Sequence, residues 1–220
     1  MSSIIVPENT AVRSEPPTHD AVAYGARWSA VHGGYFSDPT VAESLIRAVR
    51  EAVAVDAPSI IADLGGGTGY VLSSLLNQFA LPDVRCINVE SSPEQAAACH
   101  DWRIKIVPTP IPALTREDLD SGNERLMFIM RSVLHYFGRD GLRPILEHLR
   151  EQMRSGELFI HQTACCAQRR TAVLLNSLYR SIGTGKWYPT LEELGRTLEA
   201  TGWRVRCSSP APRLRLTSAE

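Results

Sequence analysis

A run of alternate glycines directly behind a short apolar segment constrains this chain more than any other feature. Ser59 to Leu64 predicts a buried strand, and Tyr70 to Phe79 predicts a helix with its apolar residues on one face. The glycines between them therefore occupy a tight strand-to-helix turn. Glycine lets a ligand approach the backbone closely while the chain adopts positive φ, so the turn predicts a site for a nucleoside cofactor.

The spacing of these glycines distinguishes between cofactors. A dinucleotide-binding fingerprint has the pattern G-x-G-x-x-G, and its third glycine stands where helix and strand pack closely. Here Gly65, Gly67 and Gly69 alternate, and Tyr70 occupies the position three residues beyond Gly67. A bulky tyrosine at that position argues against NAD.

The pattern Asp63-x-Gly65-x-Gly67-x-Gly69 resembles the first motif of class I S-adenosylmethionine-dependent methyltransferases. In that family the loop passes under the methionine and ribose portions of the cofactor, and the leading acid helps hold the methionine end. A second acid, Glu90, ends the next apolar run, and a family carboxylate at this place accepts both ribose hydroxyls. The resemblance implies S-adenosylmethionine as cofactor, S-adenosylhomocysteine as product and no metal. The implied cofactor-binding residues are Asp63, Gly65, Gly66, Gly67, Thr68, Gly69, Glu90, Ser91, Arg131 and Ser132.

Length and charge limit the classes of protein to which the chain can belong. At 220 residues it fits one domain with an ample core. Its 23 basic and 24 acidic residues give a net charge of −1 without a long run of either sign, so the basic footprint of a nucleic-acid binder is missing. We expect a small-molecule substrate, no nucleic-acid partner, and a monomer or a homodimer.

The sequence carries no signal for export or for a membrane. No apolar stretch is long enough to span a bilayer, and the first residues lack the basic start and apolar centre of a secretory signal. The five cysteines form an odd, unpatterned set, which is typical of a reducing compartment. The neighbours Cys165 and Cys166 have no further ligand at zinc spacing, so we interpret them as small packing residues. These features predict a cytoplasmic protein.

The order of the predicted elements indicates an α/β fold. Behind the glycine turn, strands and helices alternate, which implies right-handed crossovers and a mainly parallel sheet. The resemblance implies a Rossmann-like, seven-stranded, mostly parallel sheet with helices on both faces. Predicted strands lie at 59–64, 84–89, 105–107, 126–130, 157–163, 203–208 and 213–217; predicted helices begin at Pro39, behind Asp38, and lie at 70–79, 93–100, 142–153, 168–181 and 190–201.

Three segments are interpreted apart from this alternation. Residues 1–19 contain three prolines and many polar side chains, and we expect them to form a flexible tail. Residues 20–220 are expected to form a single methyltransferase domain. Within it, the aromatic-rich residues 20–37 predict an N-terminal helical cap, and residues 164–189 predict an insert on the substrate side.

The second most specific feature is the stretch from Phe128 to Phe137, which ends in Val-Leu-His-Tyr-Phe. It resembles the segment after the fourth strand in small-molecule O-methyltransferases, which have Val-Leu-His-Asp-Trp there, and in plant members the matching histidine is the general base. His135 is therefore the candidate catalytic base, although Tyr136 and Phe137 depart from the pattern. An unperturbed imidazole has a pKa of about 6.5 and can accept the proton of an attacking hydroxyl group. A packing role is the alternative.

Aromatic residues of the cap and the insert predict a chamber for the methyl acceptor. Aromatic faces with an arginine suit a small, partly apolar substrate. For His161 a hydrogen-bonded core position is the alternative. The predicted substrate-binding residues are Tyr24, Arg27, Trp28, Tyr35, His161 and Tyr179.

These features together predict methyl transfer to a small molecule, at oxygen. The alternatives are a small-molecule N-methyltransferase and a non-catalytic, S-adenosylmethionine-binding regulatory protein. A protein or nucleic-acid methyltransferase is disfavoured by the charge balance and by the absence of an Asn-Pro-Pro-Tyr-like sequence after the fourth predicted strand. The contact with adenine stays open, because Val107 to Pro112 lacks the aspartate often found there in the family.

Overall fold

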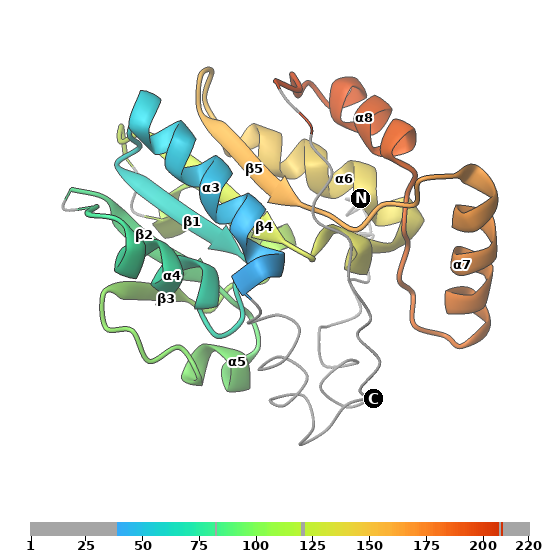
Figure 1. Cartoon of the computed structure of the whole chain (residues 1–220), viewed down its shortest axis with the longest axis horizontal. Helices are drawn as coiled ribbons and strands as arrows, with labels where there is room; N and C mark the ends of the chain where they lie inside the picture. Colours follow the sequence, from blue (N-terminus) through green and yellow to red (C-terminus); the bar gives the residue numbers. More distant parts are fainter. Residues whose placement is uncertain (1–38, 82, 120–121, 207, 209–220) are drawn as a thin grey trace, which may run out of the picture.

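A five-stranded parallel sheet forms the centre of the molecule (Figure 1). The computed structural model describes residues 39–81, 83–119, 122–206 and 208. The strand order is β3-β2-β1-β4-β5, so the direction of chain progression reverses between β1 and β4. Ligands of open α/β sheets bind at such a reversal, outside the carboxyl ends of the strands. The strands are β1 (Ile60–Leu64), β2 (Arg85–Val89), β3 (Ile104–Val107), β4 (Leu126–Arg131) and β5 (Leu158–Gln162).

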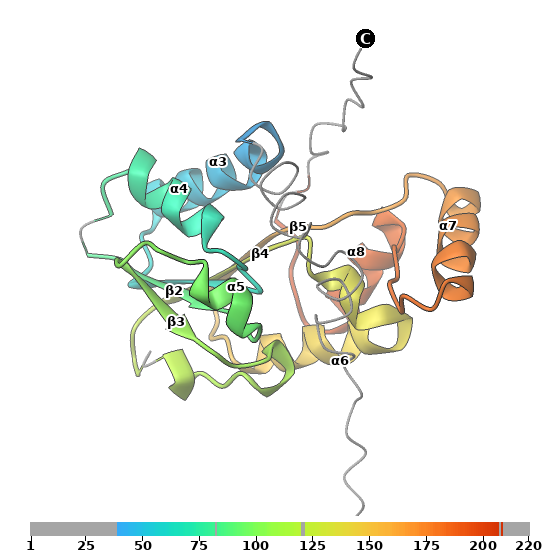
Figure 2. The same cartoon turned by 90° about the horizontal axis from the view of Figure 1, so that it is seen from below.

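Helices cover both faces of this sheet, as the sequence predicts (Figure 2). On one face lie α3 (Pro39–Val55) and α4 (Tyr70–Gln78), and on the other lie α6 (Gly138–Glu151) and α8 (Leu191–Ala200). Strands buried on both faces are mainly apolar, which explains why β1 and β4 are hydrophobic except for Asp63 and Arg131 near their carboxyl ends. Each face has its own hydrophobic core, one behind α3 and α4 and one behind α6 and α8.

Local capping signals set the ends of two helices. Helix α8 begins behind a complete capping box, in which Thr190 and Glu193 bond each other's backbone N–H groups, and Gly202 follows its end with φ of 83°. Helix α5 (Pro93–Ala97) begins behind Ser92, whose hydroxyl accepts a hydrogen bond from Gln95 N. The predicted start of both helices is confirmed, but α5 ends well before the predicted limit near residue 100.

Three short 3₁₀ helices connect the main elements. They are η3 (Ile111–Ala113), η4 (Glu117–Leu119) and η5 (Leu134–Phe137). Helix α6 follows η5 directly and begins at Gly138, so Asp140 lies in its first turn and not in front of it. The last of the three, η5, contains the candidate base His135.

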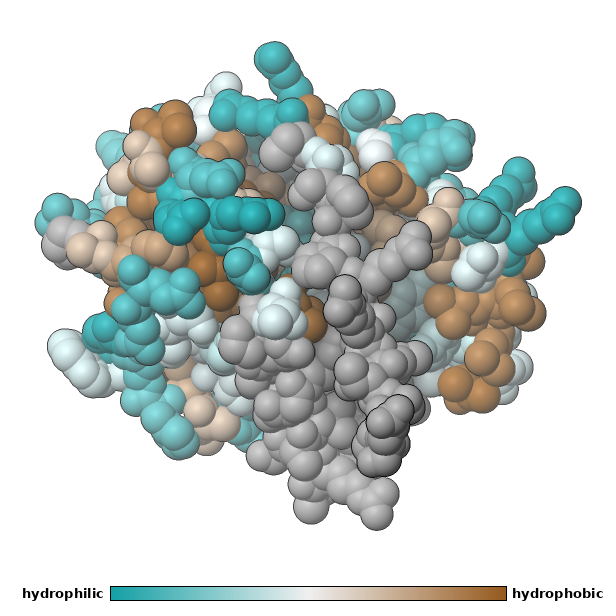
Figure 3. Space-filling model, in the orientation of Figure 1, coloured by the Kyte–Doolittle hydropathy of each residue, from teal (hydrophilic) through white to brown (hydrophobic). Residues whose placement is uncertain are grey.

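Helix α7 (Arg169–Ser181) projects from the side of the molecule, beyond the end of the sheet in both cartoon views (Figures 1 and 2). Its outer face is apolar and exposed, and Figure 3 shows hydrophobic side chains gathered over this part of the surface. The predicted insert after β5 therefore contains a real helix. Its exposed apolar side chains are Val173, Leu174, Leu178 and, just after the helix, Ile182.

The sequence predicts seven strands, and the described residues contain five. Residues 203–206 form no strand, because Trp203 N–H donates to Leu198 O at the end of α8 and the Trp203 indole donates to Leu146 O of α6. These bonds place the segment across the end of two helices. The predicted strand 213–217, the tail 1–19 and the cap 20–37 lie outside the described residues.

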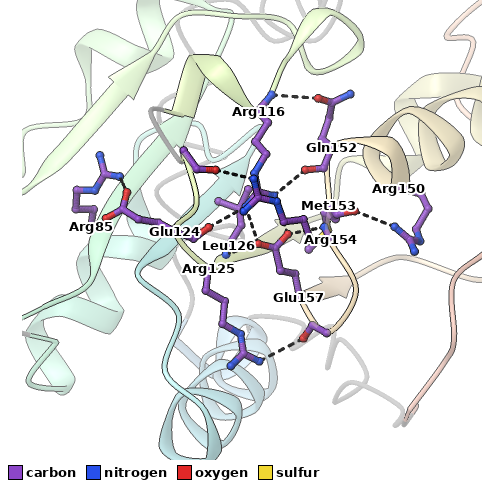
Figure 4. Close-up of polar contacts among 12 residues, drawn as sticks. Arg85, Arg116, Glu124, Arg125, Leu126, Arg150, Gln152, Met153, Arg154 and Glu157 are labelled. Carbon is purple, nitrogen blue, oxygen red and sulfur yellow. Dashed lines mark hydrogen bonds and ion pairs between the residues drawn. The ribbon is translucent and has the colours of Figure 1, made fainter.

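At the amino ends of the strands, an ion pair between Arg116 and Glu157 ties several loops together (Figure 4). The Arg116 guanidinium donates to both carboxylate oxygens of Glu157, at 2.7 and 2.8 Å, and to Gln152 O and Glu124 O. The same carboxylate accepts the backbone N–H of Leu126, where β4 begins. This cluster lies at the edge of the sheet opposite the glycine turn and has a structural role.

Candidate functional site

Four polar side chains meet at the carboxyl ends of three adjacent strands. Asp63 lies near the end of β1, Asn88 near the end of β2, Glu90 directly after β2, and Arg131 at the end of β4. Alternate residues of a strand face the same side of the sheet. Because Ile61, Cys86 and Ile129 pack in the core behind α3 and α4, the four polar residues face that side as well.

The glycine turn covers these side chains and leaves almost no room for larger residues. Gly65, Gly67 and Gly69 all have positive φ, of 69°, 57° and 75°. A methyl group at Gly66 would lie 2.5 Å from Asn88 Oδ1 and 2.8 Å from Asp63 Oδ2, and one at Gly69 would lie 2.4 Å from Cys99 Sγ. The turn therefore requires glycine both for its backbone conformation and for its close contact with the residues beneath it.

Glu90 holds the glycine turn against the start of α5. Its carboxylate accepts Gly67 N–H at 3.0 Å and Ser92 N–H at 2.7 Å, and its side chain is 7% exposed. Burial raises the pKa of Glu90, whereas the backbone hydrogen bonds from Ser92, Gly67 and Ser91 lower it. A carboxylate offers about four lone-pair positions, so beside these three backbone donors about one position remains for a hydroxyl group of a ligand.

Asp63 is the most deeply buried charged group of the site, at 1% exposure. No described residue donates a hydrogen bond to either of its carboxylate oxygens. Burial raises the pKa of Asp63 to about 7; the Arg131 guanidinium opposes the rise and the Glu90 carboxylate adds to it. A buried acceptor without a donor is costly, and such groups often mark functional sites.

Arg131 and Ser132 form a strained corner at the end of β4. Ser132 has φ of 57°, the only positive value among the described residues other than glycine, and its N–H donates to Gln162 O at 2.8 Å. The Arg131 guanidinium lies over the Tyr70 ring, 5.7 Å from its centre. Strain of this kind is concentrated at functional sites. The corner also brings Val133 against Gly65.

His135 is buried, at 6% exposure, under residues of the insert. Its ring stacks on Tyr188 with centroids 5.0 Å apart and lies 4.2 Å from the Tyr136 ring, while its carbonyl accepts Trp187 N–H. On α7, the Asn176 amide accepts Tyr188 N–H and donates to Tyr188 O, so that the insert is fixed over the histidine. The imidazole therefore has a defined orientation.

The remaining predicted site residues are distributed over several parts of the molecule. Thr68 and Ser91 are half-buried beside the glycine turn and Glu90. His161 lies on β5, on the sheet face behind α6 and α8, where its ring contacts Phe159 and its Nδ1 is 2.8 Å from Thr163 Oγ1. Burial lowers the pKa of His161 to about 4, so its ring is neutral at pH 7. Tyr179 packs on Tyr188. Tyr24, Arg27, Trp28 and Tyr35 lie outside the described residues.

Two residues of this arrangement were not predicted from the sequence. Asn88 is completely buried two positions before Glu90, and its Nδ2 donates to Gly67 O at 2.9 Å. Asn176 is buried on α7. A polar residue inside an otherwise apolar strand was the available signal for Asn88, whereas nothing near Asn176 in the sequence indicates its contact with Tyr188.

The described residues contain neither a group of side chains suited to hold a metal ion nor a helix long and apolar enough to cross a membrane. Cys165 and Cys166 are free thiols. Burial raises the pKa of Cys165 to about 11, so it is protonated at pH 7. Cys165 packs against the hydrophobic core behind α6 and α8, and Cys166 is buried.

Known structures resemble this chain in fold. No protein-family model matches the sequence, and no curated protein matches it significantly. The 1,6-didemethyltoxoflavin-N1-methyltransferase of Burkholderia thailandensis, with S-adenosylhomocysteine bound, matches 96% of this chain and 86% of its own length, at 17% identity and a TM-score of 0.61.

Two further structures show the same likeness. The plantazolicin methyltransferase BpumL, in complex with a desmethyl substrate analogue and S-adenosylhomocysteine, matches 86% of this chain and 70% of its own length, at 14% identity and a TM-score of 0.58. An O-methyltransferase family protein from Burkholderia thailandensis matches 76% of this chain and 53% of its own length, at 16% identity and a TM-score of 0.57. At these identities the likeness shows that this chain shares the fold of these three structures.

Proposed function

We propose that this protein is an S-adenosylmethionine-dependent methyltransferase that acts on a small molecule, at oxygen. The observation that carries the proposal is the group formed by Asp63, the glycine turn and Glu90 at the reversal of strand order. Each of these features matches one part of a nucleoside that carries a charged amino acid: an acid for the ammonium group, a glycine backbone surface for the sugar, and a second acid for a sugar hydroxyl. The fold, and the bound S-adenosylhomocysteine of its structural neighbours, support this choice of cofactor.

The residues present fit S-adenosylmethionine. The two carboxylate oxygens of Asp63 receive no donor from the described residues, so this carboxyl group, when ionised, is available to pair with the ammonium group of the methionine portion. The glycine turn gives the close backbone surface over which ribose and methionine would lie. Glu90 keeps lone-pair capacity for a ribose hydroxyl beside the positions that accept the backbone N–H groups of Gly67, Ser92 and Ser91.

The cofactor would supply a methyl group that its sulfonium centre already activates. The protein then mainly positions the acceptor, excludes water and, where the acceptor is a hydroxyl, removes a proton. His135 is the proposed base: Tyr188 and Tyr136 fix its ring, and a neutral imidazole nitrogen can accept the proton as the acceptor oxygen bonds to the methyl carbon.

The cap and the insert are proposed to enclose the acceptor. Gln162, at the end of β5, donates to Val41 O and to the Ser44 hydroxyl in the first turns of α3. The start of α3 and the end of β5 therefore lie beside each other, at the carboxyl edge of the sheet. This supports a chamber formed by Tyr24, Arg27, Trp28, Tyr35 and Tyr179, with His161 as a further predicted contact.

Transfer to nitrogen is the second candidate, because the first of the neighbours above is an N-methyltransferase and shares the fold over nearly the whole chain. A neutral amine can attack the methyl group without a base. In that case the pH dependence of turnover would follow the pKa of the substrate amine and would not depend on His135.

The test begins with the acceptor. Incubating the protein with methyl-labelled S-adenosylmethionine and fractions of a cell extract should label one small molecule; binding without any labelled acceptor would favour a non-catalytic, cofactor-binding protein. Once the acceptor is identified, we expect His135→Ala to lower turnover of that acceptor by about 100-fold or more. The loss should be largest at pH values below the pKa of the acceptor hydroxyl group, where the hydroxyl keeps its proton. The matched control is the exposed His100→Ala. Unchanged turnover of His135→Ala from about pH 6 to about pH 9 would remove the base.

A further inference from the structure

Asp63 and Asn88 form a buried pair across two neighbouring strands. They are register partners in the parallel pairing of β1 and β2, and both lie beneath Gly66. Their exposures are 1% and 0%. A methyl group at Gly66 would touch oxygens of both residues, so the two side chains flank one point of the backbone.

The pair contains more acceptors than donors. Both oxygens of Asp63 and Oδ1 of Asn88 are buried, and no described residue donates a hydrogen bond to any of them. Three buried acceptors without a donor are unusual, because each costs about 1 to 3 kcal/mol when it is left unmet. A proton on the Asp63 carboxyl group would turn one of these three acceptors into a donor for another.

The amide of Asn88 cannot supply such a donor by turning around. Its Nδ2 donates to Gly67 O at 2.9 Å, and a reversed amide would place an oxygen against this carbonyl. The Asn88 side chain also interacts with the Cys99 thiol and opposes the rise in the pKa of Cys99 that burial causes. The Asn88 Nδ2 group thus already donates to Gly67 O, and Asn88 Oδ1 lies beneath Gly66 together with the Asp63 carboxyl group.

The charged groups around Asp63 are few. Arg131 on β4 favours the ionised carboxylate, whereas burial and the Glu90 carboxylate after β2 disfavour it. The Cys86 and Cys99 thiols on the same side have pKa values that burial raises, so both are neutral at pH 7. The balance favours a protonated carboxyl near and below pH 7.

We propose that Asp63 carries a proton in the ligand-free protein and through it donates a hydrogen bond to Asn88 Oδ1, and that an arriving ammonium group displaces this proton to the solvent. The hydrogen bond from the Asp63 carboxyl group would fix the orientation of the Asn88 amide. Asn88 Nδ2 in turn donates to Gly67 O, and Gly67 N–H donates to Glu90 Oε2. Asn88 is thus a positioning residue that connects the buried Asp63 to Glu90, the proposed ribose-binding residue, through the glycine turn. The release step rests on the proposed function, because the ammonium is that of the cofactor.

Calorimetry with S-adenosylhomocysteine tests the release. Titrations at pH 6 in two buffers of different ionisation enthalpy give the number of protons released on binding. We expect about 0.9 proton at pH 6 and close to none at pH 8.5, since the ammonium stays charged while the free carboxyl is about nine-tenths protonated only at the lower pH. Binding without proton release at pH 6 would overturn the inference and leave the proposed function intact.

Two variants identify the source of the proton. Asp63→Asn has nearly the same shape, and its amide can donate to Asn88 Oδ1, so we expect weaker binding with no proton release at pH 6. The matched control is Glu90→Gln, because the pKa of Glu90 is also raised. Release that persists in Asp63→Asn and disappears in Glu90→Gln would assign the proton to Glu90 and contradict the inference.

A measurement on the ligand-free protein keeps the two hypotheses separate. In protein labelled with ¹³C at the aspartate carboxyl groups, the Asp63 resonance should titrate near pH 7, and it is assigned by its loss in Asp63→Asn. A resonance that titrates near pH 4 would show that Asp63 is ionised in the free protein and would overturn the inference. If S-adenosylhomocysteine does not bind at all, the proposed function and the release step both fail, and this titration still decides whether Asp63 carries the proton.

Discussion

Replacing Gly66 by alanine is expected to damage the site while leaving most of the fold in place. The added methyl group would lie 2.5 Å from Asn88 Oδ1 and 2.8 Å from Asp63 Cγ and Oδ2, well inside van der Waals contact. Asn88 cannot retreat without breaking its hydrogen bond to Gly67 O. Overpacking of a buried site costs about 1 to 3 kcal/mol, and loss of the hydrogen bond adds about 1 kcal/mol. The expected loss of stability is therefore about 2 to 4 kcal/mol.

The matched control is Gly195→Ala in the middle of α8, where a methyl group would meet no atom within 4 Å. Alanine is the better helix former, so this variant should gain about 0.5 to 1 kcal/mol. Urea unfolding, followed by circular dichroism, gives both free energies. Calorimetry should also show that only Gly66→Ala loses binding of S-adenosylhomocysteine. If both variants unfold at the same urea concentration and bind equally well, the glycine turn does not pack on Asp63 and Asn88 as described.

Three other predictions concern charge and packing. Because folding raises the pKa of Asp63 from 3.8 to about 7, the contribution of its protonated form to stability is complete below pH 3.8 and is lost as pH rises through 7. The difference in unfolding free energy between the wild type and Asp63→Asn should therefore change by about 4 kcal/mol between these two pH values. A difference that stays constant with pH would contradict the raised pKa. Arg116→Ala should cost about 2 to 4 kcal/mol in urea unfolding because it leaves a buried carboxylate unpaired, whereas Arg143→Ala, in an exposed helical ion pair, should cost less than about 0.5 kcal/mol; equal losses would contradict the structural role of the buried pair. Asn176→Ala removes both side-chain hydrogen bonds to the residue that stacks on His135, so the His135 imidazole resonances should shift or broaden in NMR spectra, and unchanged resonances would show that α7 does not orient the ring.

Local sequence signals predicted the parts of the fold that local chemistry decides. The glycine spacing after Asp63, the capping box at Thr190 and the proline at the start of α3 each act within a few residues, and each has the predicted structure. Asp63 and Glu90, each predicted near the end of an apolar run, lie at the carboxyl ends of the paired strands β1 and β2. Apolar runs likewise marked the two central strands β1 and β4, because the middle of a parallel sheet is buried on both faces.

Contacts between distant residues decided the features that the sequence did not reveal. Residues 203–206 have a strand-like composition, but the bonds of Trp203 to α8 and α6 determine their path. Asn88 gains its importance from Gly66 and Gly67, more than 20 residues away in the chain. The left-handed conformation of Ser132 depends on its hydrogen bond to Gln162 of β5. None of these partners can be identified from spacing or periodicity.

The central claim is that the carboxyl edge of this sheet binds S-adenosylmethionine, and a calorimetric titration of the purified protein tests it most directly. We expect saturable binding of both S-adenosylmethionine and S-adenosylhomocysteine at one site, and no binding of NAD. Glu90→Ala should weaken the affinity by about 10- to 100-fold for each ribose hydrogen bond that it removes, because a hydrogen bond to a charged acceptor is worth about 1.5 to 3 kcal/mol. A protein that binds neither nucleoside, or that binds them equally well without Glu90, would contradict the claim.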